Sequence, residues 1–190
     1  MRVATIMIFV LGFIGVAAAG DKAGVRMPDT IDVAGKPLVL NGMGLREATF
    51  FKVDVYVAGL YLESVSSDAG AIIASQQTKR LVLRFVRDVG RGDIVKAWNS
   101  GFAGNAIVKL ATIQGQIDRL NAWMGDFEKG DTLSFTFVPG QGVAVDINGA
   151  RKGVIAGEDF SRSVLAIWLG PKPPTGALRK GLLGKHGGAR

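Results

Sequence analysis

Residues 42–63, GMGLREATFFKVDVYVAGLYLE, decide the fold of this chain. Phe, Val and Tyr are frequent from residue 50 to residue 62, and these side chains favour a pleated, partly buried surface. Gly59 interrupts the run, which predicts a β-bulge or a close approach of another segment at that point. We therefore expect the stretch to form one long, bent β-strand.

Arg46 and Tyr56 are the side chains in this stretch that indicate a binding site. They are ten positions apart, so on an uninterrupted strand they point to the same face, where one carboxylate can contact both the guanidinium and the phenol. A charge among apolar neighbours needs a partner. That partner is either an internal carboxylate, such as Glu47 or Asp54, or a bound anion.

The rest of the chain predicts an α+β domain, in which helices cover an antiparallel sheet. Alternation with period two predicts strands, and apolar side chains at three- and four-residue spacing predict helices. The expected elements are a hairpin over residues 32–41, a short helix over 69–75 capped by Asp68, a strand over 79–86, two helices between 92 and 125 broken near 101–105, strands over 131–137, 142–147 and 152–155, and a closing helix over 158–169.

Residues 1–19 have the pattern of a secretory signal peptide. Arg2 precedes an apolar run that ends in three alanines, and Asp21 follows. We expect cleavage before Gly20 or Asp21 and export to a bacterial periplasm, with a eukaryotic secretory route or a retained membrane anchor as alternatives. Residues 20–31 are expected to form a polar leader. Because the chain has no cysteine, its core alone must stabilise it after export.

The net charge of +7 is concentrated at the C-terminus. Residues 171–190 contain five basic side chains and no acidic one, whereas residues 20–170 contain 17 basic and 16 acidic side chains. A nearly neutral body argues against nucleic acid as a partner, because duplex binding requires a basic face. Pro173, Pro174 and five glycines predict that residues 171–190 form a basic, flexible tail. That tail is either a solvated segment or a contact for an anionic membrane.

The composition excludes several common active-site chemistries. The chain has no cysteine and a single histidine, His186 in the tail, so neither a Cys–His nucleophile nor a clustered zinc site is available. Residues 42–44, GMG, lack the third glycine of a dinucleotide fingerprint, and the sequence contains no phosphate-binding loop. We expect neither a metal nor another cofactor.

Three segments, in the same order, resemble the chalcone isomerase family. The first holds GMGLR at residues 42–46 and AGLYLE at 58–63, the second is IVKAW at 94–98, and the third is SRSVLAIWLG at 161–170. The resemblance covers residues 30–170. It implies an open-faced β-sandwich, an antiparallel sheet covered by a layer of helices, as a domain of residues 32–170.

The resemblance also suggests roles for single residues. Arg46 matches the arginine that binds a ligand's anionic oxygen or carboxylate in this family. Tyr56 matches a position where catalytic members carry threonine and fatty-acid-binding members carry tyrosine. The enzyme's pocket tyrosine and asparagine correspond to Gly90 and Ala97, whose side chains form no hydrogen bonds, while Ser161 lies near the enzyme's last polar contact. This loss of polar groups argues against isomerase activity, because a phenolate needs aligned polar partners.

These observations lead to one main hypothesis and two alternatives. The main hypothesis is an exported, non-catalytic binding protein for a fatty acid or similar amphipathic anion, with ligand contacts from Arg46, Tyr56, Ser161, Trp98 and Phe85. Its pocket would lie between sheet and helices, where the following residues serve either as ligand wall or as ordinary core: Phe51, Val53, Val55, Leu83, Phe85, Trp98 and Phe102. The alternatives are a chalcone isomerase-type intramolecular lyase and an envelope scaffold without a ligand.

Overall fold

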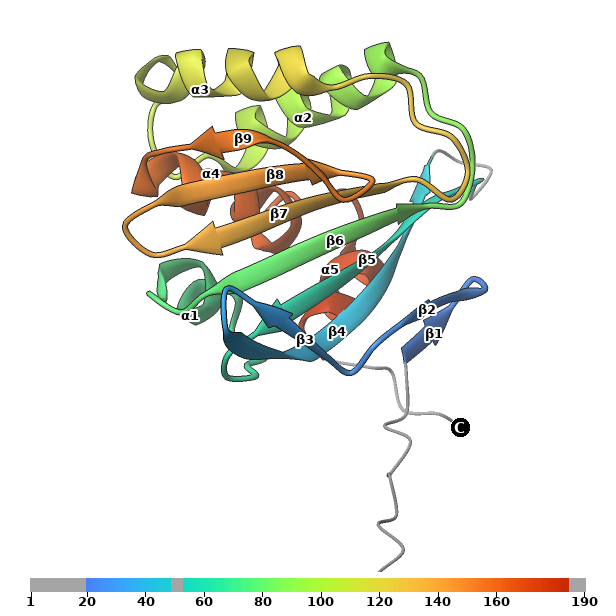
Figure 1. The fold of residues 1–190 in the computed structure, drawn as a ribbon. Coiled ribbons are helices and arrows are strands. Elements are labelled where there is room, and N and C mark those ends of the chain that lie inside the picture. Colours follow the sequence, from blue (N-terminus) through green and yellow to red (C-terminus); the bar gives the residue numbers. More distant parts are fainter. Residues whose placement is uncertain (1–19, 49–52, 185–190) are drawn as a thin grey trace, which may run out of the picture.

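A computed structural model describes residues 20–48 and 53–184 of the chain. Seven strands form one antiparallel sheet, side by side in the order of the sequence (Figure 1). Their bounds are β3 Thr30–Val33, β4 Lys36–Ala48, β5 Val53–Leu62, β6 Lys79–Phe85, β7 Thr132–Val138, β8 Gly142–Ile147 and β9 Ala150–Ile155. A two-stranded hairpin, β1 Gly20–Lys22 and β2 Val25–Met27, precedes the sheet. The expected signal peptide, residues 1–19, lies outside the described residues.

The helices cover one face of the sheet (Figure 1). In the described part of the chain they are α1 Ala69–Ala74, α2 Arg91–Asn105, α3 Leu110–Trp123, α4 Glu158–Leu169 and α5 Gly176–Leu182. Their buried side chains and those of the sheet form one main core, in which Trp168, Phe102 and Phe135 are among the largest members. No helix of the described residues is both long and apolar enough to cross a membrane. The arrangement confirms the α+β prediction.

The stretch that decides the fold forms two strands, so the prediction of one long strand is wrong. β4 and β5 pair antiparallel, and Arg46 lies directly opposite Tyr56, just before a shift of register. Directly opposed residues of an antiparallel pair point to the same face, so the shared face that we expected arises for a different reason. Residues 46–55 contain no glycine, proline or asparagine, and therefore no sequence signal marks the reversal of the chain.

Another segment of the chain packs closely against Gly59, as the sequence predicts. The strand pairing of β5 runs without a register shift through this residue, so the alternative of a bulge is not realised. A Cβ at this position would lie only 2.2 Å from the Met27 sulfur. Residues 20–31, expected as a polar leader, form β1, β2 and the start of β3, and Met27 packs with Val57 on the sheet face opposite the helices.

Helix α2 extends further than the sequence predicts. The expected break near residues 101–105 occurs at residues 106–109. Gly101 lies inside α2 because a Cβ there would be 2.7 Å from Ile167 of α4, so this glycine permits close helix packing and does not end the helix. The predicted short helix, the strands from β6 onward and the closing helix are confirmed within two residues. Asp68 caps α1 as expected, since its Oδ1 accepts a hydrogen bond from the Ala71 N–H at 3.0 Å.

The expected flexible tail contains a packed helix, which corrects the prediction for residues 176–183. Leu178, Leu182 and Leu183 of this segment are buried in the main core. Helix α5 lies against β4, where a Cβ on Gly44 would be 2.4 Å from the Leu178 carbonyl oxygen. The glycine and proline content suggested a loose chain, but leucines spaced by four and five residues give the segment an apolar face. Burial of that apolar face stabilises the helix despite the high glycine and proline content of the segment.

Candidate functional site

Tyr56 is a buried phenol that joins the sheet to the last long helix. Only 5% of its surface is exposed, and its hydroxyl oxygen accepts a hydrogen bond from Trp168 Nε1 of α4 at 3.0 Å. Burial raises the pKa of Tyr56 to about 12, although the Trp168 hydrogen bond and the Arg46 charge both lower it. Tyr56 is therefore a neutral hydrogen-bond donor at any physiological pH.

Arg46 stands beside this phenol as a half-buried cation. It lies opposite Tyr56 on β4, close enough for its charge to affect the Tyr56 pKa. Its Nη1 donates a hydrogen bond to the Glu47 carbonyl oxygen. Among the described residues, no carboxylate lies within 4.0 Å of the guanidinium, so neither Glu47 nor Asp54 forms the internal ion pair considered above.

An aromatic cluster surrounds Tyr56. Phe85 meets it edge to face, with ring centroids 5.9 Å apart, and Phe127 stacks on Phe85 at 4.4 Å. Trp98 packs edge to face with Trp168, the hydrogen-bond partner of Tyr56, with ring centroids 5.5 Å apart. We call Arg46, Tyr56, Phe85, Trp98 and Trp168 the Arg46–Tyr56 site.

The structure thus unites four of the five predicted site residues and adds one. Arg46, Tyr56, Phe85 and Trp98 lie together, and Trp168 joins them through its indole N–H. Trp168 was not predicted, because its bond to Tyr56 spans 112 positions of sequence. Its place on the apolar face of the closing helix was a possible signal, since that face is buried in the main core.

The aromatic and aliphatic residues named as candidate walls belong largely to the packed core. Leu83, Phe85, Trp98 and Phe102 are almost fully buried in the main cluster. Val55 packs against that cluster as a partly buried residue, while Phe51 lies outside the described residues. One polar atom in this region stands out: the buried Trp98 Nε1 has no hydrogen-bond partner within the described part of the chain. An unpaired buried N–H is costly, so it marks a place where a bound polar group would be stabilised.

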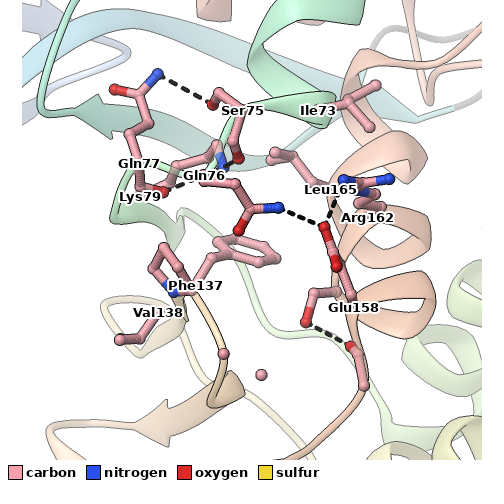
Figure 2. Close-up of a pocket in the computed structure, with 15 residues that line it drawn as sticks. Ile73, Ser75, Gln76, Gln77, Lys79, Phe137, Val138, Glu158, Arg162 and Leu165 are labelled. Carbon is pink, nitrogen blue, oxygen red and sulfur yellow. Dashed lines mark hydrogen bonds and ion pairs between the residues drawn. The ribbon is translucent and has the colours of Figure 1, made fainter.

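Ser161 lies apart from the other predicted residues. It lines a cleft of about 250 Å³ between the loop after α1, the turn between β7 and β8, and the start of α4 (Figure 2). Its hydroxyl donates a hydrogen bond to the Gly157 carbonyl oxygen at 2.8 Å. Ser161 and the Arg46–Tyr56 site are therefore parts of two different regions.

Comparison with known proteins places this geometry in a family. A family model described as chalcone isomerase-like matches residues 19–184. The chain belongs to the chalcone isomerase-like family. Among solved structures, a fatty-acid binding protein from Arabidopsis thaliana, AtFAP1, superposes with a TM-score of 0.66 at 17% sequence identity, covering 87% of this chain and 95% of that one. At such identity the likeness shows a shared fold. No curated protein matches the chain.

Within this chalcone isomerase-like protein, Gly90 and Ala97, which the resemblance matches to the enzyme's pocket tyrosine and asparagine, contribute no polar group to the site. Gly90 precedes α2 as its N-cap, and Ala97 is an exposed residue on that helix. What the Arg46–Tyr56 site offers is a cation, a neutral phenol donor and a buried indole N–H against aromatic walls. These groups suit the recognition of an anion with an apolar body.

Proposed function

We propose that this protein is an exported, non-catalytic binding protein that holds a fatty acid or similar amphipathic anion at the Arg46–Tyr56 site. The observation that carries the proposal is the pairing of Arg46 with a buried, neutral Tyr56 whose oxygen is held by Trp168. The structural similarity to a solved fatty-acid binding protein supports the same ligand class.

The chemistry of the two side chains is complementary. Tyr56 accepts a hydrogen bond from Trp168, and among the described residues no group accepts a hydrogen bond from the Tyr56 hydroxyl. That proton is available to a ligand oxygen, while Arg46 supplies a charge-assisted hydrogen bond. A carboxylate accepts both bonds at once, and the adjoining aromatic rings favour an apolar chain behind it.

Binding without catalysis follows from what surrounds the anion site. Cyclisation of a phenolic ketone requires several aligned groups to stabilise developing charge. Gly90 and Ala97 provide no such groups, and the Ser161 hydroxyl is engaged with Gly157 in another region.

Native mass spectrometry of the mature protein, purified from its source envelope and from a recombinant host, tests the ligand. We expect a bound fatty acid that is lost from Arg46→Ala and retained by Arg84→Ala. Arg84 is a matched control because it is an exposed arginine next to Phe85 that points to the opposite face of β6. Equal retention by both variants, or failure of the wild-type protein to take up added fatty acids, would refute the proposal.

Export rests on the signal peptide pattern of residues 1–19. Mass measurement of the protein from the envelope fraction tests this part separately. A mature chain that begins at Gly20 or Asp21 is expected, and an uncleaved chain in the cytoplasmic fraction would contradict export.

A further inference from the structure

A second site lies at the other end of β6 from the Arg46–Tyr56 site. Lys79 begins this strand and Phe85 ends it, which separates the two regions by roughly 20 Å of extended chain. Lys79 lines the 250 Å³ cleft that also contains Ser161 (Figure 2). The features of this cleft are independent of the ligand proposed above.

Lys79 is a buried cation without a full counter-charge. Only 5% of its surface is exposed, and its Nζ donates hydrogen bonds to the carbonyl oxygens of Ser75 at 2.7 Å and Gln77 at 3.2 Å. Among the described residues, no carboxylate lies within 4.0 Å of Nζ. Burial and, to a smaller extent, the nearby Arg162 charge together lower the pKa of Lys79 to about 8, against the opposing effects of Glu63 and Glu158. An anion near Nζ would therefore be stabilised.

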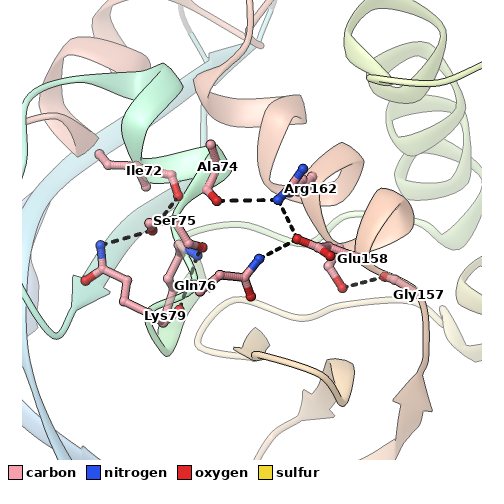
Figure 3. A network of polar contacts seen from close by, with 10 residues as sticks. Ile72, Ala74, Ser75, Gln76, Lys79, Gly157, Glu158 and Arg162 are labelled. Atoms are coloured by element: carbon pink, nitrogen blue, oxygen red, sulfur yellow. Dashed lines mark hydrogen bonds and ion pairs between the residues drawn. The ribbon is translucent and has the colours of Figure 1, made fainter.

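Glu158 is the carboxylate among the residues that line this cleft, and its charge acts on Lys79 from beyond 4.0 Å. Its Oε1 accepts hydrogen bonds from Arg162 on α4 and from Gln76 on the loop after α1, so it bridges the cleft (Figure 3). The Glu158 side chain is 55% exposed and that of Arg162 33%. Exposed ion pairs of this kind contribute little to stability, so an external carboxylate can replace Glu158 as the partner of Arg162.

The remaining walls define the size and polarity of an occupant. Apolar side chains of Ile73, Phe137 and Leu165 line the cleft beside the charged groups. Its volume of about 250 Å³ is below the range of roughly 300–1,000 Å³ typical of sites for drug-sized ligands. A long-chain fatty acid does not fit such a space, whereas a small carboxylate with a compact apolar group does.

We propose that this cleft is a separate binding site for a small organic carboxylate, held by Lys79 and Arg162 after Glu158 is displaced. In the occupied state the carboxylate accepts hydrogen bonds from Arg162 and from the remaining N–H of Lys79. The apolar part of the ligand contacts Phe137 and Leu165. Glu158 acts as an internal competitor that swings away from Arg162 on binding.

Titration with benzoate, followed by calorimetry and by amide chemical shifts, tests this site. Arg162→Gln and Lys79→Met should each weaken binding by about tenfold or more, because each removes a charged partner of the carboxylate. Glu158→Gln should tighten binding several-fold, since it removes the competing charge. Lys96→Met, which changes an exposed lysine on α2, should leave the affinity unchanged.

The variants also separate this proposal from the first. Arg46→Ala should leave benzoate binding at the cleft intact, with shifts confined to residues 73–79, 137–142 and 157–165. Lys79 bonds the Ser75 carbonyl oxygen at the C-terminal end of α1 and Arg162 bonds that of Ala74, so the two variants are compared and each keeps the contact that the other loses. No binding at millimolar benzoate, weaker binding in Glu158→Gln, or an affinity that follows Arg46 instead of Arg162 would overturn the proposal.

Discussion

At the scale of single residues, Tyr56 connects structure and proposed function. Its hydroxyl oxygen accepts a hydrogen bond from the Trp168 indole. Among the described residues, no group accepts a hydrogen bond from the Tyr56 hydroxyl, so that hydroxyl can donate to a ligand. The same burial that keeps the phenol neutral places it among aromatic rings. A change at Tyr56 therefore affects stability through the hydroxyl oxygen that Trp168 contacts, and ligand binding through the hydroxyl proton.

Tyr56→Phe should destabilise the protein by about 1–3 kcal/mol, because it leaves the buried Trp168 N–H without an acceptor. The free energy of unfolding in urea measures this effect. Fatty-acid affinity should fall as well, since the phenol proton is lost. Unchanged stability would mean that the Trp168 hydrogen bond contributes nothing, and unchanged affinity would remove Tyr56 from the site.

The chain contains two tyrosines, and alkaline titration by ultraviolet difference absorbance observes both. Burial raises the pKa of Tyr56 and of Tyr61 to about 12. Each stabilises the folded state fully below pH 10, the ordinary phenol value, and this contribution is lost as the pH rises through 12. We expect no phenolate signal from native protein near pH 10, and both signals there after denaturation. Tyr61→Phe assigns the remaining transition to Tyr56, and native ionisation near pH 10 would contradict its burial.

At the scale of elements, the contact between α5 and β4 is made by backbone. Gly42 and Gly44 face Gly181 and Leu178 at distances that leave no room for side chains. Asn41 Nδ2 adds a hydrogen bond to the Leu182 carbonyl oxygen at 2.7 Å. The glycines of the GMGLR motif thus seat α5 on the strand that carries Arg46.

Gly44→Ala should destabilise the protein by about 1–3 kcal/mol, because its Cβ would overlap the Leu178 carbonyl oxygen 2.4 Å away. Gly92→Ala is the matched control. Gly92 lies in the first turn of α2, and a methyl group added there would meet nothing within 4 Å, so alanine should be neutral or stabilise by up to about 1 kcal/mol. Thermal unfolding compares the two, and equal effects would refute the tight α5 contact.

A second link between elements involves Glu63 at the end of β5. Its carboxylate accepts hydrogen bonds from Lys36 Nζ at 2.9 Å and from the Thr78 N–H at 2.6 Å, and these bonds lower its pKa to about 2. The resulting stability is present above pH 4.5 and is lost as the pH falls through 2. As the pH is lowered from 4.5 to 2, the urea concentration at the midpoint of unfolding should fall less for Glu63→Gln than for the wild-type protein. Parallel declines would show that the carboxylate is not perturbed.

At the scale of the whole molecule, the order of strands sets where the fold is most resistant to opening. β6 is the middle strand of seven, with helices on one face, whereas β3 and β9 are the edges. Amide hydrogen exchange should therefore be slowest in β6 and its neighbours and faster in β3 and β9. Similar protection across all seven strands would indicate that the edges are covered by another molecule.

How much of this architecture the sequence reveals depends on whether the signal is local. The closing helix over residues 158–169 was predicted correctly because its apolar spacing is visible within the segment. The reversal between β4 and β5 has no turn residues, and α5 becomes stable only through contact with β4, so both were missed. The Arg46 and Tyr56 pair was anticipated from the spacing of the two residues and from the family resemblance, whereas Trp168 depends on a contact between distant segments.

The Trp168 to Tyr56 hydrogen bond also makes the protein its own optical reporter. Indole emission depends on the polarity around Nε1, and in this fold that nitrogen is bonded to the phenol proposed to receive the ligand. An anion that accepts a hydrogen bond from the Tyr56 hydroxyl changes the electron density at the oxygen that Trp168 contacts. Intrinsic fluorescence of Trp168, read against Trp98→Phe and Trp123→Phe backgrounds, would then follow occupancy in real time without a label.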